Sequence, residues 1–278
     1  MQCLVSKSRL IRFGPSAAFA IMLVAPRDVL SQPSVAADVG VFSQFIWRGV
    51  TSTNRPVLQP EVMVTTPVGG MSLLLGLWGN IEPVRYDGPR ELSSLGGLPG
   101  PFITQSQAWV EMSGTVAKHF DAVAGVQGYF YPHIANLSDF NTAEVYASLT
   151  ANVPLTPSVT VNYDVARIRG AYLEGGVSQA LTGERLGELT VSLIAGFSAG
   201  QAVDSTGRDL AYFERDGLSH VDASASATFA LGPVSIAPEA HFILARDAWA
   251  KVVEPDVSRG AKLWVGTTLS WSSARDSR

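Results

Sequence analysis

The sequence predicts an all-β fold: a transmembrane, antiparallel, up-and-down β-barrel of about 12 strands, preceded by a cleaved signal peptide. Runs of about ten residues alternate between apolar and polar side chains, which is the pattern of a strand with one face against an apolar environment. The connections between these runs are alternately short and long. Although 46% of the residues are hydrophobic and 16% are charged, the longest apolar run falls short of the roughly 18 residues that a spanning helix needs.

The N-terminus has the order of features that marks a secretory signal peptide. Basic residues precede an apolar run at residues 17–25, and small residues follow it. We predict that residues 1–36 form the signal peptide and that residues 37–278 form the barrel. Cleavage follows either Ser31 or Ala36, and Ala36 is preferred. A disordered or anchoring N-terminal helix is the alternative.

Removal of this segment changes what chemistry remains. It takes away four bases and one acid, which leaves 16 bases against 23 acids, and it removes Cys3, the sole cysteine of the chain. The mature chain therefore has no disulfide, no thiol nucleophile and no cysteine metal ligand.

The first strands are predicted on either side of a polar break. Residues 38–48 form the first strand, residues 49–55 form the break, and residues 56–66 form the second strand. In the second strand Leu58 and Val62 share one face while Glu61 shares the other. In the first strand one face contains both apolar and polar residues, so the sequence does not decide which face points into the barrel. The third strand, residues 71–80, follows a tight turn.

The later strands repeat the same pattern. Residues 142–153 alternate most cleanly, with Glu144 on the polar face and Val145 on the apolar face. The remaining strands are predicted at residues 104–116, 122–131, 159–168, 171–181, 188–199, 218–231, 234–245 and 261–272.

The connections indicate how the barrel is oriented. Those after even-numbered strands are short, and those after odd-numbered strands are mostly long, apart from the bend near Arg169. An even strand number places both chain ends on one side, and in bacterial barrels the short turns face the periplasm. Aromatic residues fall on the apolar faces near the strand ends, as in the girdles of a membrane barrel: Phe45, Trp47, Phe130, Phe197, Phe229, Phe242 and Trp271. In a soluble sandwich, the alternative, they fill the core.

One segment carries a family resemblance. The stretch Val41-Phe-Ser-Gln-Phe-Ile-Trp-Arg-Gly-Val50, followed by Pro56-Val-Leu-Gln-Pro60, resembles the opening of the TorF-like porin family of bacterial outer-membrane proteins, and Trp47-Arg48-Gly49 is its most specific part. Residues 159–164 and 172–178 resemble the middle strands of that family. The resemblance implies an outer-membrane barrel. The chain departs from many such barrels at its end, where Trp271 is followed by a polar tail.

The polar faces define the predicted lumen. With these faces inward, the lumen contains seven acidic residues, together with two bases and two histidines. An excess of acids attracts cations and repels anions. The predicted pore-lining residues are Arg48, Glu61, Glu111, Glu144, Asp164, Glu174, His220, Asp222, Glu239, His241 and Lys262. If these groups pair with one another instead, the lumen is plugged.

Aromatic residues also face inward in this register, where they either fill space or guide a sugar or another amphipathic solute. They are Trp109, Tyr129, Tyr131, Tyr146, Tyr172 and Trp264. The connection at residues 81–103 either folds in as a constriction or lies on the surface.

An enzyme is the competing hypothesis from another class. A barrel hydrolase needs a serine beside a histidine base on the lipid-facing side. His220 and His241 lie instead on the polar face, His119 in a turn and His133 in a loop. His220, Asp222, Glu239 and His241 are expected to be neighbours on two antiparallel strands, where they form either a catalytic or metal cluster or ordinary lumenal hydrogen bonds.

The sequence thus predicts an outer-membrane channel for passive diffusion of small hydrophilic solutes, with a cation preference and no cofactor, rather than an enzyme. Its expected partners are outer-membrane lipids, small hydrophilic solutes or cations, periplasmic chaperones and the barrel-assembly machinery, and no nucleic acid. The alternative is a non-conducting structural or ligand-binding barrel, whose activity would reside in the charged connections at residues 200–217 and 246–260.

Overall fold

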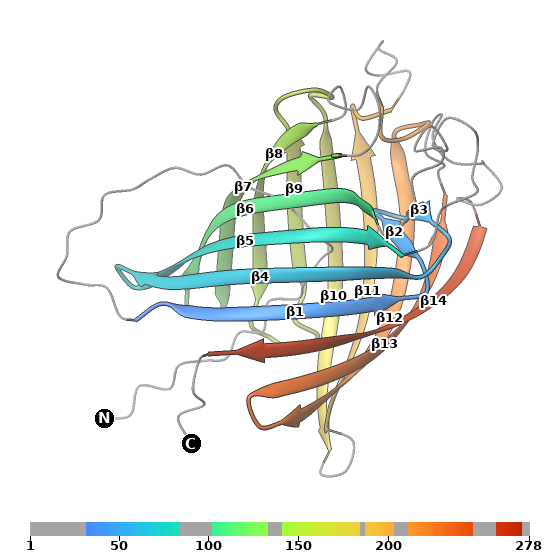
Figure 1. Cartoon of the computed structure of the whole chain (residues 1–278). Coiled ribbons are helices and arrows are strands. Elements are labelled where there is room, and N and C mark those ends of the chain that lie inside the picture. Colours follow the sequence, from blue (N-terminus) through green and yellow to red (C-terminus); the bar gives the residue numbers. More distant parts are fainter. Residues whose placement is uncertain are drawn as a thin grey trace.

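The computed structural model describes residues 32–83, 102–132, 141–183, 187–202, 211–246 and 260–273. Within these ranges, twelve antiparallel strands form the wall of a closed barrel (Figure 1). The wall strands are β1 (Ser34–Phe42), β4 (Val57–Val68), β5 (Met71–Glu82), β6 (Phe102–Ala117), β7 (Phe120–Phe130), β8 (Thr142–Ala151), β9 (Ser158–Asp164), β10 (Ala171–Gly183), β11 (Gly187–Ala199), β12 (Gly217–Leu231), β13 (Val234–Ala245) and β14 (Gly260–Ser272). The predicted all-β barrel is therefore confirmed.

The strands follow an up-and-down order, and β1 closes the barrel against β14. Each wall strand pairs antiparallel with the next one along the chain, and β1 pairs with both β4 and β14. A hydrogen bond from Ser273 N to Val35 O fastens the two ends of the described chain together, and both lie at the same end of the barrel (Figure 1). The described residues contain no helix that is long and apolar enough to cross a membrane.

The outer surface is apolar, as the alternation predicted. Leu77, Leu193 and Leu263 are among many large aliphatic side chains that point outward and are exposed. A band of this kind is stable only against lipid tails, because water would make so large an apolar surface costly. The predicted outward aromatics are also exposed at Phe130, Phe197, Phe229, Phe242 and Trp271.

The first strand departs from the prediction. The wall strand β1 ends at Phe42, and residues beyond it form a separate hairpin of β2 (Phe45–Trp47) and β3 (Val50–Thr53). This hairpin turns into the barrel, so the prediction that Phe45 and Trp47 face outward is wrong, since both side chains are buried. A wall position for Arg48 is wrong as well, because it lies in the turn of the hairpin.

The turn explains why the chain folds back at this point. Arg48 and Gly49 have φ values of 50° and 81°. Two consecutive positive φ values are typical of the tight two-residue turns that join hairpin strands. We call the hairpin, residues 45–53, the plug. It leaves the wall at Phe42 and returns at Val57, which are register partners on neighbouring strands.

The core of the molecule lies inside the barrel, around the plug. Aromatic and aliphatic side chains from the plug, the wall and two later connections form a single buried cluster. Its members are Phe45, Trp47, Val50, Val57, Met63, Trp78, Trp109, Tyr129, Ile168, Tyr172, Tyr212 and Phe213. Toward the short turns, inward side chains such as Ser148, Thr190 and Ser226 are only half-buried. The lumen is therefore filled at the end of the long connections and more open at the other end.

Several predicted features fall outside the described residues. These include residues 1–31 of the predicted signal peptide, most of the connection at residues 81–103, His133, residues 203–210 and 247–259, and the polar tail after residue 273. β1 begins at Ser34, so it contains the last three residues of the range predicted as signal peptide, and the cleavage site remains a prediction.

Candidate functional site

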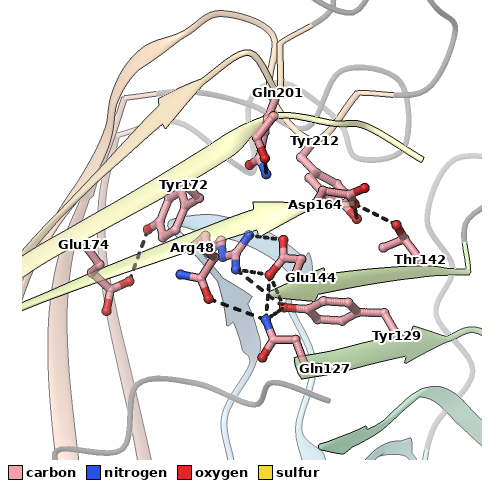
Figure 2. A network of polar contacts seen from close by, with 12 residues as sticks. Arg48, Gln127, Tyr129, Thr142, Glu144, Asp164, Tyr172, Glu174, Gln201 and Tyr212 are labelled. Atoms are coloured by element: carbon pink, nitrogen blue, oxygen red, sulfur yellow. Dashed lines mark hydrogen bonds and ion pairs between the residues drawn. The ribbon is translucent and has the colours of Figure 1, made fainter. Parts of the chain in front are cut away.

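Arg48 at the tip of the plug is the centre of the site. Its Nη1 and Nη2 donate to the two carboxylate oxygens of Glu144 on β8, at 2.8 and 2.6 Å (Figure 2). The guanidinium carbon lies 4.5 Å from the ring centre of Trp47 and 4.3 Å from that of Tyr172 on β10. Two parallel hydrogen bonds with aromatic faces alongside are a favourable setting for a guanidinium.

The charge of Arg48 is stable in this position. Burial acts to lower the pKa of the guanidinium, but the adjacent Glu144 carboxylate, together with Tyr129 and Tyr172, acts to raise it, and the net pKa is raised. The pair is almost completely shielded, since the exposed fraction of the side chain is 8% for Arg48 and 0% for Glu144. The interaction is therefore an ion pair in a low-dielectric environment, where water and salt weaken it little.

The wall holds Glu144 in place independently of the plug. On β7, Gln127 Nε2 and the Tyr129 hydroxyl donate to Glu144 Oε2, at 2.5 and 3.0 Å. These donors stand on the neighbouring strand, where Gln127 is the register partner of Glu144. The carboxylate is thus oriented by the wall, and Arg48 completes its set of partners.

Asp164, also buried, organises the rim next to this site. Its Oδ1 accepts hydrogen bonds from the backbone N–H groups of Ala166, Arg167 and Ile168, which end β9 at Asp164 rather than at the predicted residue 168. Its Oδ2 accepts from Thr142 Oγ1 and from the Tyr212 hydroxyl (Figure 2). Burial, followed by the nearby Tyr131 and Asp164, raises the pKa of Tyr212, so this phenol remains a donor.

A second segment, residues 211–213, packs against the plug. The Trp47 ring lies edge-on to Tyr212 at 5.1 Å between ring centres and nearly parallel to Phe213 at 6.4 Å. Phe213 in turn stacks on Tyr172 at 5.9 Å. Backbone N–H groups of Tyr212 and Phe213 donate to the carbonyl of Gln201, which holds the segment in place. The connection at residues 200–217 therefore contributes directly to the lumenal core.

The plug tip also rests on His220 of β12. A Cβ atom added to Gly49 would overlap the side chain of His220, so only glycine fits there. His220 Nδ1 lies 3.1 Å from Ser219 Oγ and 3.4 Å from the Tyr172 hydroxyl. The pairing of β11 with β12 shifts register here, and both Ser219 and His220 are buried.

The predicted cluster of four residues on β12 and β13 is formed only in part. His241 Nδ1 lies 2.8 Å from Asp222 Oδ2, and its Nε2 lies 3.4 Å from Glu239 Oε2. Its ring stacks on Trp264 with centres 3.9 Å apart. His220 does not join this group, because its ring is turned toward Tyr172. Among the residues that the structure describes, no set of side chains is arranged to hold a metal ion.

The other predicted residues also lie on the inner face of the barrel. Glu111 accepts a hydrogen bond of 2.6 Å from the Tyr146 hydroxyl in the more open half of the lumen. The Tyr172 hydroxyl donates to Glu174, and Lys262 donates to Thr51 of the plug. Glu61 on β4 is the register partner of Trp78 on the adjacent strand β5. Whether these side chains line a conducting path remains a prediction.

Sequence reasoning missed several residues of the site. Asp38 is a buried acid on the inner face of β1, and it is the first residue of the predicted first strand, for which the sequence did not decide the inward face. Gln127, Thr142 and Tyr212 bind the predicted acids directly. The first two stand on inward-facing positions that the alternation does identify, whereas Tyr212 lies in a connection without a periodic pattern.

Comparisons with known proteins identify the architecture. No protein-family profile matches the chain, and no curated protein sequence matches it. LpxR from Salmonella typhimurium is similar in structure with a TM-score of 0.50 and 7% identity, over 86% of this chain and 99% of that one. An outer-membrane channel from Pseudomonas putida F1 has a TM-score of 0.50 and 9% identity, over 90% and 100% of the two chains. The chain has the fold of an outer-membrane β-barrel.

A further similar structure is the NanC porin, with a TM-score of 0.48 and 8% identity over 85% of this chain and 98% of that one. At these identities the likeness concerns the fold alone. The function has to be argued from the plug and the inner face.

Proposed function

We propose that the protein is a porin-like channel of the outer membrane through which small hydrophilic solutes diffuse passively, with a preference for cations. The observation that carries this proposal is the inner face of the closed barrel, on which acidic side chains outnumber basic ones. A lumen with this balance lowers the energy of a cation inside it and raises that of an anion. Transport of this kind needs no cofactor and no energy source other than a concentration gradient.

The plug sets the condition for conduction. Arg48 neutralises Glu144, and the buried cluster fills the half of the lumen near the long connections. A solute that crosses the barrel must pass this half, so conduction requires the plug to move away from Glu144. In the orientation predicted from the short turns, the plug closes the external half of the barrel, and Glu111 and Glu239 lie in the half toward the periplasm.

We also infer a relationship to the TorF-like porins, which is supported by the Trp47-Arg48-Gly49 stretch. The three residues act together in the structure: Trp47 packs in the core, Arg48 binds Glu144, and Gly49 lies against His220. Export through a signal peptide, assembly by periplasmic chaperones and the barrel-assembly machinery, and lipid around the apolar outer surface are the expected context.

The test is conductance in planar lipid bilayers under a salt gradient. We expect discrete current steps and a cation-selective reversal potential for the wild type. Glu111→Gln should move the reversal potential toward zero, whereas the matched variant Glu111→Asp, which keeps the charge, should not. Replacement of residues 44–55 by a short Gly-Ser link should raise the conductance, because Phe42 and Val57 are already neighbours in the wall.

The second candidate function is a non-conducting structural or ligand-binding barrel. The burial of the plug favours it, since Val50 and Thr53 are both 1% exposed. Electrical silence from the folded wild type and from the folded variant without residues 44–55 would reject the channel and support this alternative.

We propose no catalytic role for the histidines. In the described residues, His220 meets Ser219 and Tyr172 through the same ring nitrogen, and no carboxylate hydrogen-bonds to its ring. A serine nucleophile needs a base that a third group orients. The two ring nitrogens of His241 meet Asp222 and Glu239, and no serine hydroxyl within the described residues hydrogen-bonds to them.

A further inference from the structure

We propose that the barrel wall contains a binding site for solutes with a guanidinium group, and that Arg48 occupies this site as an internal competitor. This inference rests on the proposed channel in that it names a class of cation that the channel would admit. In this proposal the guanidinium group is recognised by four wall residues: Glu144, Gln127, Tyr129 and Tyr172. A solute that binds there displaces Arg48 and so releases the plug.

The shape of the site favours a planar group with two parallel donors. Both oxygens of Glu144 face the guanidinium, each with one hydrogen bond. The Tyr172 ring covers one face of the guanidinium at 4.3 Å. An ammonium group has no flat face to lay against the ring and cannot present two coplanar donors to the carboxylate. The site should therefore discriminate between the two kinds of cation.

The site remains formed when Arg48 is absent, because its parts are held by the wall. Glu144 keeps the donors Gln127 Nε2 and Tyr129 Oη from β7. The Tyr172 hydroxyl contacts Glu174 on β10 and His220 on β12, so two wall residues hold its ring. A free guanidinium therefore meets a preorganised pocket and does not have to order it.

Where the plug packs against the wall, two buried polar side chains have no hydrogen-bond partner among the described residues. Thr53 Oγ1 on the plug has no hydrogen-bond partner there, and neither does the side-chain amide of Gln107 on β6, although both residues are 1% exposed. Gln107 is the register partner of Trp78, whose ring contacts Phe45 of the plug. A buried polar group without a hydrogen-bond partner destabilises the state in which it is buried. Water would reach these groups when the plug lifts, so displacement of Arg48 by a solute is opposed less than the size of the buried cluster suggests.

The experiment is chemical rescue of the Arg48→Ala variant in the complete barrel. This change empties the guanidinium position and leaves the four wall residues in place. The probes are methylguanidinium and methylammonium chloride at equal ionic strength in the millimolar range. The readout is tryptophan fluorescence, because Trp47 is next to the guanidinium position, and a Trp47→Phe variant in the same background shows which part of the signal comes from it.

We expect saturable binding of methylguanidinium that is at least about tenfold tighter than that of methylammonium, since only the guanidinium can make two parallel charged hydrogen bonds to Glu144 and lie flat against the Tyr172 ring. The added substitution Glu144→Gln should abolish this preference, and Glu111→Gln should not. Equal responses to the two cations, or a methylguanidinium response that survives Glu144→Gln, would overturn the inference.

Two further measurements keep the test independent of the variant and of the channel. If Arg48→Ala does not fold, thiol labelling of a Val50→Cys barrel with native Arg48 serves instead, and methylguanidinium should accelerate it more than methylammonium. Equal acceleration, or none, again overturns the inference. Binding without any conductance would reject the proposed channel alone, and conductance without selective binding would reject this site alone.

Discussion

Removal of the Arg48 charge should release the plug. In Arg48→Met the hydrophobic volume of the side chain is largely kept, but the Glu144 carboxylate stays buried without a cation. Loss of one partner of a buried ion pair costs about 3–5 kcal/mol. Glu144 retains hydrogen bonds from Gln127 and Tyr129, so we expect a value near the lower limit, about 3 kcal/mol.

The effect can be measured as the rate at which a thiol buried in the plug is labelled. Cys3 is the sole cysteine of the sequence, so a barrel that begins at residue 32 with Val50→Cys has a single thiol, which is buried in the plug. Labelling by a water-soluble maleimide then reports the population of the open plug when opening and closing are fast. A change of about 3 kcal/mol corresponds to a roughly 100-fold faster reaction, because each 1.4 kcal/mol is about tenfold.

A double-mutant cycle separates the ion pair from other effects. Glu144→Gln alone leaves Arg48 buried without its carboxylate, whereas Arg48→Met with Glu144→Gln removes both charges. The double variant should therefore cost less than the sum of the single variants by more than about 0.5 kcal/mol. Lys118→Met, which removes a charge from an exposed turn, should leave the rate unchanged. Labelling of Arg48→Met within about twofold of its parent, or additive single effects, would refute the reasoning.

Three other predictions concern the turn, the wall and the chain start. Gly49→Ala should accelerate the labelling by at least about tenfold, because a residue with a Cβ pays about 1–2 kcal/mol in a left-handed backbone and the alanine Cβ would overlap His220 of the wall. Gly69→Ala, in an open turn, should leave the labelling unchanged. Leu193→Arg, at a position that is 50% exposed to lipid, should destabilise the barrel by about 2–4 kcal/mol in liposome unfolding, and Ser192→Arg on the inner face should be milder. Mass spectrometry of the exported protein should show cleavage after Ser31 rather than after Ala36, the site preferred from the sequence, because cleavage after Ala36 would remove part of β1.

The wall could be predicted because each of its strands has lipid on one side and the lumen on the other. This environment imposes a period of two on the sequence regardless of what fills the lumen. The strand predicted at residues 142–153 shows the result: Glu144 is buried inside, and Val145 is exposed outside. The boundary errors arise where side chains end a strand, as Asp164 does when it binds the backbone that follows β9.

The plug could not be predicted in this way. Phe45 and Trp47 are two residues apart, which is the spacing of lipid-facing residues on a strand, and an aromatic residue suits a lumenal core as well as a membrane surface. The decisive feature is the left-handed backbone of Arg48, which few residues other than glycine, asparagine and aspartate adopt readily. The position directly before Gly49 holds an arginine and not an asparagine or aspartate, so the sequence does not signal the turn.

The contacts of the site depend on residues far apart in the chain. Arg48 and Glu144 are 96 residues apart, and Tyr212 reaches Asp164 from a connection without periodic pattern. The four residues His220, Asp222, Glu239 and His241 were expected together from strand pairing alone. The irregularity at Ser219 and the packing of Gly49 direct His220 elsewhere, and neither is visible in a local pattern.

The attachment of the plug at Phe42 and Val57 has a quantitative consequence for a competing solute. Because both ends of the hairpin are anchored to adjacent wall strands, a displaced Arg48 remains close to Glu144, and short linkers of this kind give effective concentrations in the millimolar range. A free guanidinium compound that binds Glu144 as strongly as the Arg48 side chain does therefore has to reach a similar concentration before it occupies the site in place of Arg48. Below that concentration Arg48 rebinds Glu144 and the plug stays closed. The chain length between the two neighbouring strands therefore sets the solute concentration at which the plug is released.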